Sequence, residues 1–295
     1  MKVARLRAAV GRQGVRMRSA RGVPDARDLQ REAVLLLGGL RAVLLQLAHP
    51  AVGHGVARHS GFAQDPTARL AGTLAYVYVV ADGDPDLVRR MSGRVGRMHA
   101  AVRSGADASP AYDARDAGLQ FWVTATLHDT AVRIAEAVWG PLPATVEADL
   151  LALGGRIGTV LGMPPERWPT SVDAFDRATA DAERDLAFDD VTLAVVRDLF
   201  QARRATLPLR LAMPFLVAGT LPTLPAHLRA QLEPVVPRRA PDLLPALRRL
   251  APLYRALPIR IRHRPSRLVV AAARRYFERH PRGLGTGADG VAPAA

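Results

Sequence analysis

Helix-start signals recur along this sequence and separate segments whose apolar residues repeat at helical spacing. At Asp65-Pro66 and again at Asp84-Pro85, an aspartate that can cap a helix precedes a proline that fits the first helical turn. A later segment stops at Gly140-Pro141, a pair that ends helices. No stretch alternates apolar and polar residues with the period of two that a half-buried strand requires. The sequence therefore predicts an all-α fold.

The helical pattern also predicts where most helices begin and end. In chain order, helices are expected over 25–48, 66–81, 85–103, 116–138, 143–161, a segment capped by Thr170 or Ser171, and 189–205. Between residues 49 and 61 we expect irregular chain, because Pro50 disfavours helix in the residue before it and glycines follow. Beyond Leu207, recurring prolines predict short helices that wrap around the outside. Their amphipathic faces either pack on the core or lie on a membrane surface, and packing is the commoner arrangement.

We expect three parts in the chain. Residues 1–27 form a basic N-terminal extension, residues 28–270 a single helical domain, and residues 271–295 the basic end of a helix with a tail rich in Gly, Ala and Pro. A chain of 295 residues could form two average domains, but one large all-α unit also reaches this length.

Composition excludes some classes of site. The chain has no cysteine, which excludes disulfides, thiolate metal ligands and a cysteine nucleophile. Its formal net charge is +14, but the basic excess lies in residues 1–31 and 229–282, and the region between them is slightly acidic. Lys2 is the only lysine, and no nucleic-acid-binding motif occurs, so we expect no nucleic-acid partner. The basic flanks are either solvated surface or contacts for an anionic membrane.

Residues 33–48 are the most apolar segment. The segment contains Arg41 and Gln46 and falls short of the roughly 20 apolar residues that span a bilayer, so a helix buried within the protein explains it better. The N-terminus is basic but lacks the apolar run of an export signal. We therefore expect a cytoplasmic protein, with peripheral binding to the inner face of the membrane as the alternative.

His49, His54 and His59 invite interpretation as a metal site because they are spaced by five residues. On a helix, five residues turn the chain by about 500°, so three such side chains cannot share one face. The HExxH and ExxH patterns of helical metal sites do not occur. We expect these histidines to be capping or hydrogen-bonded residues rather than metal ligands.

Arg69 and Thr73 are four residues apart in an expected helix and therefore project from one face. An arginine on a largely apolar helix needs an anionic partner, because an unpaired buried charge is costly. That partner is either a carboxylate of the protein, such as Asp65, or the carboxylate or phosphate of a cofactor.

His99 follows two helical glycines, Gly93 and Gly96, at intervals of one turn. A glycine inside a helix costs about 1 kcal/mol relative to alanine, so the pair suggests that something approaches the backbone closely. Val95 and Met98 add apolar surroundings. A haem whose iron is bound by a neutral imidazole suits this pattern, and a histidine in an ordinary helix contact is the alternative.

Thr124 and His128 lie one turn apart in the long helix expected over 116–138. The chain has no G-x-S-x-G motif, which argues against a serine nucleophile beside them. We expect both side chains to line the core.

Four motifs, in this order, resemble the catalytic domain of the bacterial rubber oxygenases, or latex clearing proteins: QLAHPAVGHGVARHSGF, DPTARLAGTL, RVGRMHAAVRSG and YDARDAGLQFWVTATLHDTA. The same family includes the membrane-bound oxygenase of mycophenolic acid biosynthesis. The resemblance covers about residues 28–270. It implies an all-helical, globin-like domain that holds a b-type haem.

The resemblance also implies roles for individual residues. His99 matches the family's proximal iron ligand, and Arg69 and Thr73 match its arginine and threonine near the haem. The chain departs from the family at Gly72, where the rubber oxygenases have lysine, and at Thr124, where many relatives have histidine. It also lacks the glutamate proposed as the catalytic base, since no glutamate occurs between Glu32 and Glu136.

Three functions remain open from the sequence. The first is a haem b-dependent oxygenase that acts with dioxygen on an apolar terpenoid, polyisoprenoid or lipid-like substrate, with Arg69 and Thr73 as catalytic residues, His99 as the iron ligand and Gly96 beside the haem. The second is a non-catalytic haem-binding or sensor protein of the same fold. The third is a helical module without a cofactor whose basic flanks bind a membrane or, against the absence of a nucleic-acid-binding motif, nucleic acid.

Overall fold

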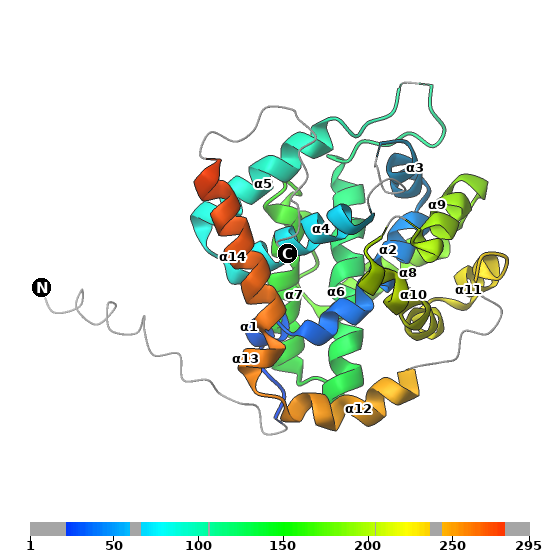
Figure 1. The fold of residues 1–295 in the computed structure, drawn as a ribbon. Helices are drawn as coiled ribbons and strands as arrows, with labels where there is room; N and C mark the ends of the chain where they lie inside the picture. The colour runs from blue at the N-terminus through cyan, green and yellow to red at the C-terminus, as the bar shows by residue number, and fades with distance from the viewer. Residues whose placement is uncertain (1–21, 60–65, 106, 204, 237–243, 281–295) are drawn as a thin grey trace, which may run out of the picture.

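The computed structural model describes residues 22–59, 66–105, 107–203, 205–236 and 244–280 (Figure 1). In this part of the chain all regular structure is helical, and the only strand-like pairing is one isolated bridge between Arg103 and Asp113. The predicted all-α class is confirmed, and the helices form a single domain.

The helices follow the chain in a fixed order. They are α1 (Ala26–Leu29), α2 (Gly39–Ala48), α3 (Pro50–His59), α4 (Pro66–Asp82), α5 (Pro85–Ala100), α6 (Ala117–Trp139), α7 (Ala144–Thr159), α8 (Val172–Arg184), α9 (Asp190–Gln201), α10 (Leu207–Thr220), α11 (Ala226–Leu232), α12 (Leu244–Ala256), α13 (Ile259–Arg262) and α14 (Arg264–Arg279). Short 3-10 helices are η1 (Ala33–Gly38), η3 (Pro165–Arg167) and η4 (Leu221–Thr223).

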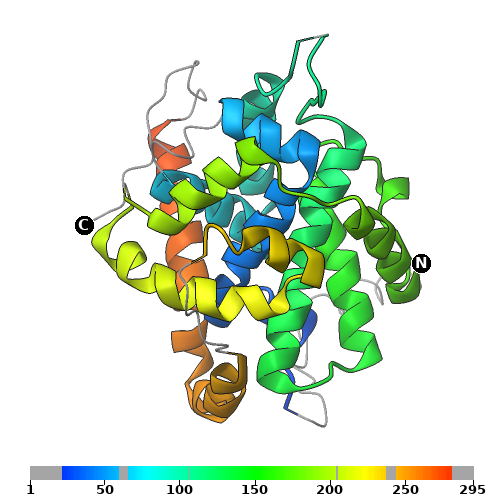
Figure 2. The same ribbon diagram turned by 90° about the vertical axis from the view of Figure 1, so that its right-hand side faces the viewer.

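The long helix α6 is the centre of the fold. Asp116 caps its first turn by accepting hydrogen bonds from the backbone N–H groups of Gly118 and Leu119, and Gly140, with φ of 78°, ends it in a conformation that favours glycine. Helices α2, α7 and α12 all pack on α6. Figure 2 shows α6 and α7 running beside each other as two green helices.

Two groups of helices flank α6. On one side α4 and α5 form a hairpin on which α14 lies, and their shared apolar core includes Tyr76, Val79, Met91 and Phe277 (Figure 1). On the other side α2, α9, α10 and α11 enclose a second core that includes the fully buried Leu228. The C-terminal helices pack on the core, as the sequence predicted.

The prediction of irregular chain between 49 and 61 is wrong for the described residues up to His59, because Pro50–His59 forms helix α3. Proline disfavours helix in the residue before it but fits the first turn of the helix that it begins. His49 accordingly adopts an extended conformation and separates α2 from α3. Gly53 serves close packing rather than irregularity: a Cβ there would collide with the Leu47 carbonyl and with the Thr192 side chain.

Three of the predicted helices also differ in extent from the observed ones. Residues 25–48 form α1, 3-10 helix η1 and α2 rather than one helix. Helix α5 ends at Ala100 rather than at 103, and α9 ends at Gln201 rather than at 205. Among the described residues no single helix has the length and apolarity needed to cross a bilayer. The pair formed by residues 33–48 and α3, bent by 102°, passes that test by length and composition only when its two parts are taken together.

Candidate functional site

The hairpin of α4 and α5 carries the four candidate site residues from the sequence, which are Arg69, Thr73, Gly96 and His99. Asp84 joins the two helices, caps α5 through the backbone N–H groups of Asp86 and Leu87, and lies 2.9 Å from the guanidinium of Arg274 on α14. The hydrogen bond from the Leu87 backbone N–H, followed by the one from the Arg274 side chain, lowers the pKa of the Asp84 carboxyl. The closed end of the hairpin is therefore firmly held.

The other end of the hairpin is open on one face. Leu70, Gly72 and Thr73 of α4 are exposed. A Cβ built on Gly72 or on Gly96 would meet no atom of the described residues within 4 Å. These helical glycines therefore do not serve contact with any described part of the chain.

Helix α7 provides the contrast. A Cβ on Gly154 would lie 2.8 Å from Nδ1 of His128, and one on Gly155 would lie 2.5 Å from the Trp168 ring. Gly154 lets α7 approach α6 closely and Gly155 leaves room for the Trp168 ring, which explains their helical cost of about 1 kcal/mol each. Gly72 and Gly96 have no such neighbour among the described residues, so both border open space.

His99 lies at the C-terminal end of α5, one turn after Gly96. Its side chain is half-buried and its Nδ1 atom is buried. Thr73 lies exposed on α4. Arg69 belongs to the first turns of α4, but its side chain, like the predicted partner Asp65, lies outside the described residues. The structure thus places His99, Gly96 and Thr73 on one hairpin.

The chemistry of this hairpin fits a flat cofactor that takes one axial ligand. His99 offers an imidazole, Gly96 leaves space one turn away, and the partly buried Val95 and exposed Met98 provide apolar cover. No group of three or more His, Asp or Glu side chains able to hold a metal ion occurs in the described part of the chain. A haem iron requires no such group, because the macrocycle supplies four of its ligands.

The three histidines spaced by five residues have separate environments. Burial lowers the pKa of His49, whose ring centroid lies 6.3 Å from that of Trp122. His54 Nε2 lies 2.5 Å from Oδ2 of Asp189, the residue that caps α9. His59 Nε2 lies 2.8 Å from the Tyr112 hydroxyl. They do not converge on one metal site.

Thr124 and His128 line the core, as the sequence predicted. The Thr124 hydroxyl donates to the backbone carbonyl of Gln120 at 2.7 Å. The His128 ring packs edge-on against Trp168 and Phe175, and burial lowers its pKa to about 4. His128 is therefore neutral at physiological pH and serves packing.

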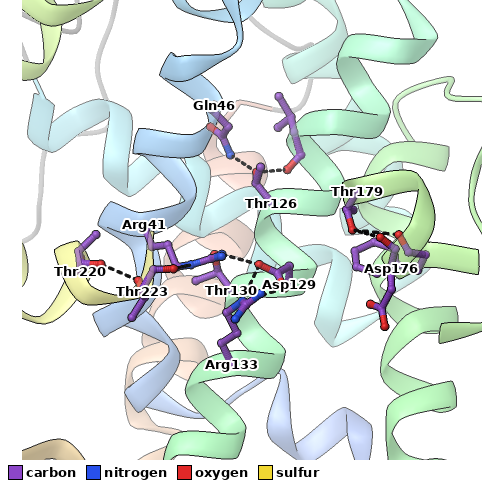
Figure 3. Close-up of polar contacts among 12 residues, drawn as sticks. Arg41, Gln46, Thr126, Asp129, Thr130, Arg133, Asp176, Thr179, Thr220 and Thr223 are labelled. Atoms are coloured by element: carbon purple, nitrogen blue, oxygen red, sulfur yellow. Dashed lines mark hydrogen bonds and ion pairs between the residues drawn. The ribbon is translucent and has the colours of Figure 1, made fainter. Parts of the chain in front are cut away.

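A buried ion pair between α2 and α6 was missed by the sequence interpretation (Figure 3). Arg41 is 2% exposed, and its guanidinium donates to Oδ2 of Asp129 at 2.5 Å, to the Thr130 hydroxyl at 3.0 Å and to the Thr223 carbonyl at 3.2 Å. Burial lowers the Arg41 pKa, and Asp129 opposes that effect. The lone arginine in an apolar segment was the signal that could have revealed this pair.

A second buried carboxylate, Glu32, was also missed. It is fully buried and accepts hydrogen bonds from the Tyr254 hydroxyl and from Arg262, each at 2.6 Å. His263 Nε2 lies 3.3 Å from the same carboxylate. Because both oxygens are engaged by residues of α12 and α13, Glu32 ties the C-terminal helices to the start of the domain.

Comparison with known proteins identifies the group to which this domain belongs. The sequence model described as "ER-bound oxygenase mpaB/B'/Rubber oxygenase, catalytic domain" matches residues 26–256, from α1 to the end of α12. Two uncharacterized proteins, one of Mycobacterium bovis and one of Mycobacterium tuberculosis, are each 32% identical over 199 residues, which cover 65% of this chain and 77% of theirs. No solved structure matches. With the α4–α5 hairpin inside the matched region, the chain belongs to the family of ER-bound oxygenase mpaB/B' and rubber oxygenase catalytic domains.

Proposed function

We propose that this protein binds haem b through His99 and uses it as an oxygenase on an apolar substrate. The observation that carries the proposal is the open hairpin face, where Gly72 and Gly96 have no described neighbour and His99 follows one turn later. Membership of an oxygenase family supports the same function. The globin-like arrangement of the helices around the cofactor is part of the proposal.

Each residue of the hairpin has a distinct task in this proposal. The His99 imidazole is the axial ligand, and Gly96 has no side chain that would keep a flat ring away from the helix. Thr73 and Arg69, which match the family's threonine and arginine, hold the cofactor's edge or a bound substrate. The bound haem supplies the redox chemistry toward dioxygen that amino-acid side chains lack.

The proton chemistry of the site depends on this chain's own residues. Glu32 and Glu136 are the nearest glutamates in sequence to the hairpin, one on each side of it. Glu32 is buried and bonded to Tyr254 and Arg262, so its carboxylate is committed to those contacts. This observation favours a second candidate function, a haem-binding or sensor protein that performs no turnover.

Haem binding is tested by titrating the protein with haemin and recording the Soret absorption. His99→Ala should weaken binding by roughly tenfold or more, because the iron loses its protein ligand. His227→Ala, which removes an exposed histidine from α11, is the matched control and should bind like the parent. Equal binding by the His99→Ala and His227→Ala variants would exclude His99 as the ligand.

The two candidate functions are separated by turnover. The reduced, haem-loaded protein is mixed with squalene, an apolar polyunsaturated probe, and dioxygen uptake and oxygenated products are measured. An oxygenase consumes dioxygen and forms products in proportion. A haem carrier or sensor retains its haem spectrum and forms no product.

A peripheral contact with an anionic membrane belongs to the same proposal. Leu250 and Leu253 on α12 are 57% and 67% exposed, and Arg248, Arg249 and Arg255 are exposed beside them. Such a surface suits the headgroup region of an anionic bilayer. Co-sedimentation with phosphatidylglycerol vesicles should fall in L250S/L253S and stay unchanged in Val191→Ser, an exposed residue on α9. Equal sedimentation of both variants would argue against this contact.

A further inference from the structure

A cavity of about 440 Å³ lies at the closed end of the α4–α5 hairpin. Asp28 and Arg31 near α1 and Tyr78 and Asp82 on α4 form one wall, and α13 with the first half of α14 forms the other. Figure 1 shows α1, α13 and the lower part of α14 gathered in this region. The second wall begins at Ile259, beyond residue 256, where the family match ends. The cavity is therefore a feature separate from the face that carries Gly72 and Gly96.

The buried side of the cavity holds polar groups. Tyr78 is 4% exposed, and its hydroxyl is buried with no hydrogen-bond partner among the described residues. Burial and the nearby Glu32 raise the Tyr78 pKa to about 12, so the phenol stays protonated at neutral pH and can donate. Because this oxygen has no exposed surface, the cavity borders Tyr78 through the other atoms of its side chain.

The charge of Glu32 behind the cavity is already offset. Arg262 donates to it at 2.6 Å, and His263, which is 8% exposed and lines the cavity, lies 3.3 Å from it. Because the carboxylate is satisfied by these groups and by Tyr254, it does not repel an anion strongly.

The open side of the cavity has an excess of positive charge. Arg31 lies 3.6 Å from Asp82, which offsets part of its charge, and Asp28 lies at the same wall. Arg260 and Arg267 are exposed, and neither has a carboxylate within ion-pair distance in the described part of the chain. Guanidinium groups match the oxygens of carboxylates and phosphates in geometry as well as charge.

We propose that this cavity binds a small molecule through a carboxylate or phosphate group held by the guanidinium groups of Arg260 and Arg267. Ile259 and Val270 line the same space and contact its hydrocarbon part. The volume is that of a metabolite-sized ligand rather than a single ion.

Calorimetric titration of the full chain tests this site with two probes, inorganic phosphate and hexanoate, in chloride buffer at constant ionic strength. At least one probe should bind saturably at one site per chain. The double variant R260Q/R267Q should bind at least roughly tenfold more weakly, because it removes both guanidinium groups that donate charged hydrogen bonds to the anion. Binding of hexanoate alone identifies a carboxylate ligand, and binding of phosphate alone a phosphorylated one.

Two controls separate the site from general charge effects. The double variant R264Q/R275Q removes the same charge from exposed positions of α14 that do not line the cavity, and it should bind like the parent. His99→Ala should bind the probe normally, which separates this site from the haem proposal. No binding of either probe, or equal loss in both arginine double variants, would overturn the inference.

Discussion

At the scale of single residues, the main electrostatic feature is a buried ion pair that joins two helices. Arg41 and Asp129 form an ion pair with the arginine 2% exposed, and the Thr130 hydroxyl and the Thr223 carbonyl complete the bonds of the guanidinium (Figure 3). Removing one partner of such a pair leaves an uncompensated charge inside the protein.

Asp129→Ala should therefore lower the free energy of unfolding by about 3 to 5 kcal/mol. Asp181→Ala is the control, because it breaks the Arg184–Asp181 pair, whose side chains are 74% and 68% exposed. An exposed pair contributes only about 0 to 1 kcal/mol. Urea unfolding monitored by circular dichroism measures both, and a similar loss in the two variants would show that the buried pair is not specially important.

Burial of His128 makes the stability of the fold depend on pH, and it also sets the direction of that dependence. Its pKa falls from 6.5 to about 4 in the folded state, so the unfolded chain binds a proton more readily between those values. Stability therefore rises with pH across this window and is lost as pH falls from 6.5 toward 4, by up to roughly 3 kcal/mol for this group.

Replacing His128 by leucine should flatten that dependence. The unfolding free energy of the parent, measured in urea at pH 7 and at pH 4.5, should fall more than that of His128→Leu. If the two proteins lose the same stability on acidification, His128 is not the group that titrates.

At the scale of elements, local sequence signals were sufficient to predict where a helix begins when it starts with a capping residue and a proline. Helices α4 and α5 begin at Pro66 and Pro85, as predicted, because capping involves only neighbouring residues. Helix α3 was not predicted, because Gly53 reads as a helix breaker unless Leu47 and Thr192 are known to lie against it. The partner of Arg41 was unpredictable for the same reason, since Asp129 lies on a different helix.

The candidate site also has features that local spacing predicts and features that depend on contacts between distant parts of the chain. The sequence located His99 at the end of a helix after Gly96 and predicted that His49, His54 and His59 do not share a site, both from helical spacing alone. It did not predict the cavity beside Tyr78, because that cavity joins α1 and α4 to helices nearly 200 residues later. The roles of Arg69 and Thr73 stay predictions.

Replacement by alanine should change the stability of the fold in opposite directions at a packed glycine, Gly155, and at a glycine that borders open space, Gly96. Gly155→Ala would press a methyl group against the rigid Trp168 ring, which should destabilise the fold by about 1 to 3 kcal/mol. Gly96→Ala meets no described atom and should stabilise the haem-free protein by up to about 1 kcal/mol through helix propensity. Thermal unfolding of the haem-free variants measures both signs. A destabilised Gly96→Ala would mean that this face packs against protein.

At the scale of the whole molecule, the helices make one all-α domain, to which we assign two separate proposed ligand sites. The open face of the α4–α5 hairpin lies within the region shared with the oxygenase family, and the cavity beside Tyr78 uses helices beyond it. A ligand that binds only the folded state stabilises it by mass action, so haem should raise the melting temperature of the parent and leave that of His99→Ala nearly unchanged.

The most direct measurement of the central claim is the absorption spectrum of protein purified from haem-supplemented cells, recorded beside His99→Gly with and without added imidazole. We predict a Soret band that corresponds to one haem per chain in the parent, its loss in His99→Gly, and its return when imidazole enters the space left by the side chain. A colourless parent protein that also fails to take up added haem, or a His99→Gly variant with the parent's haem content and spectrum, would contradict the claim.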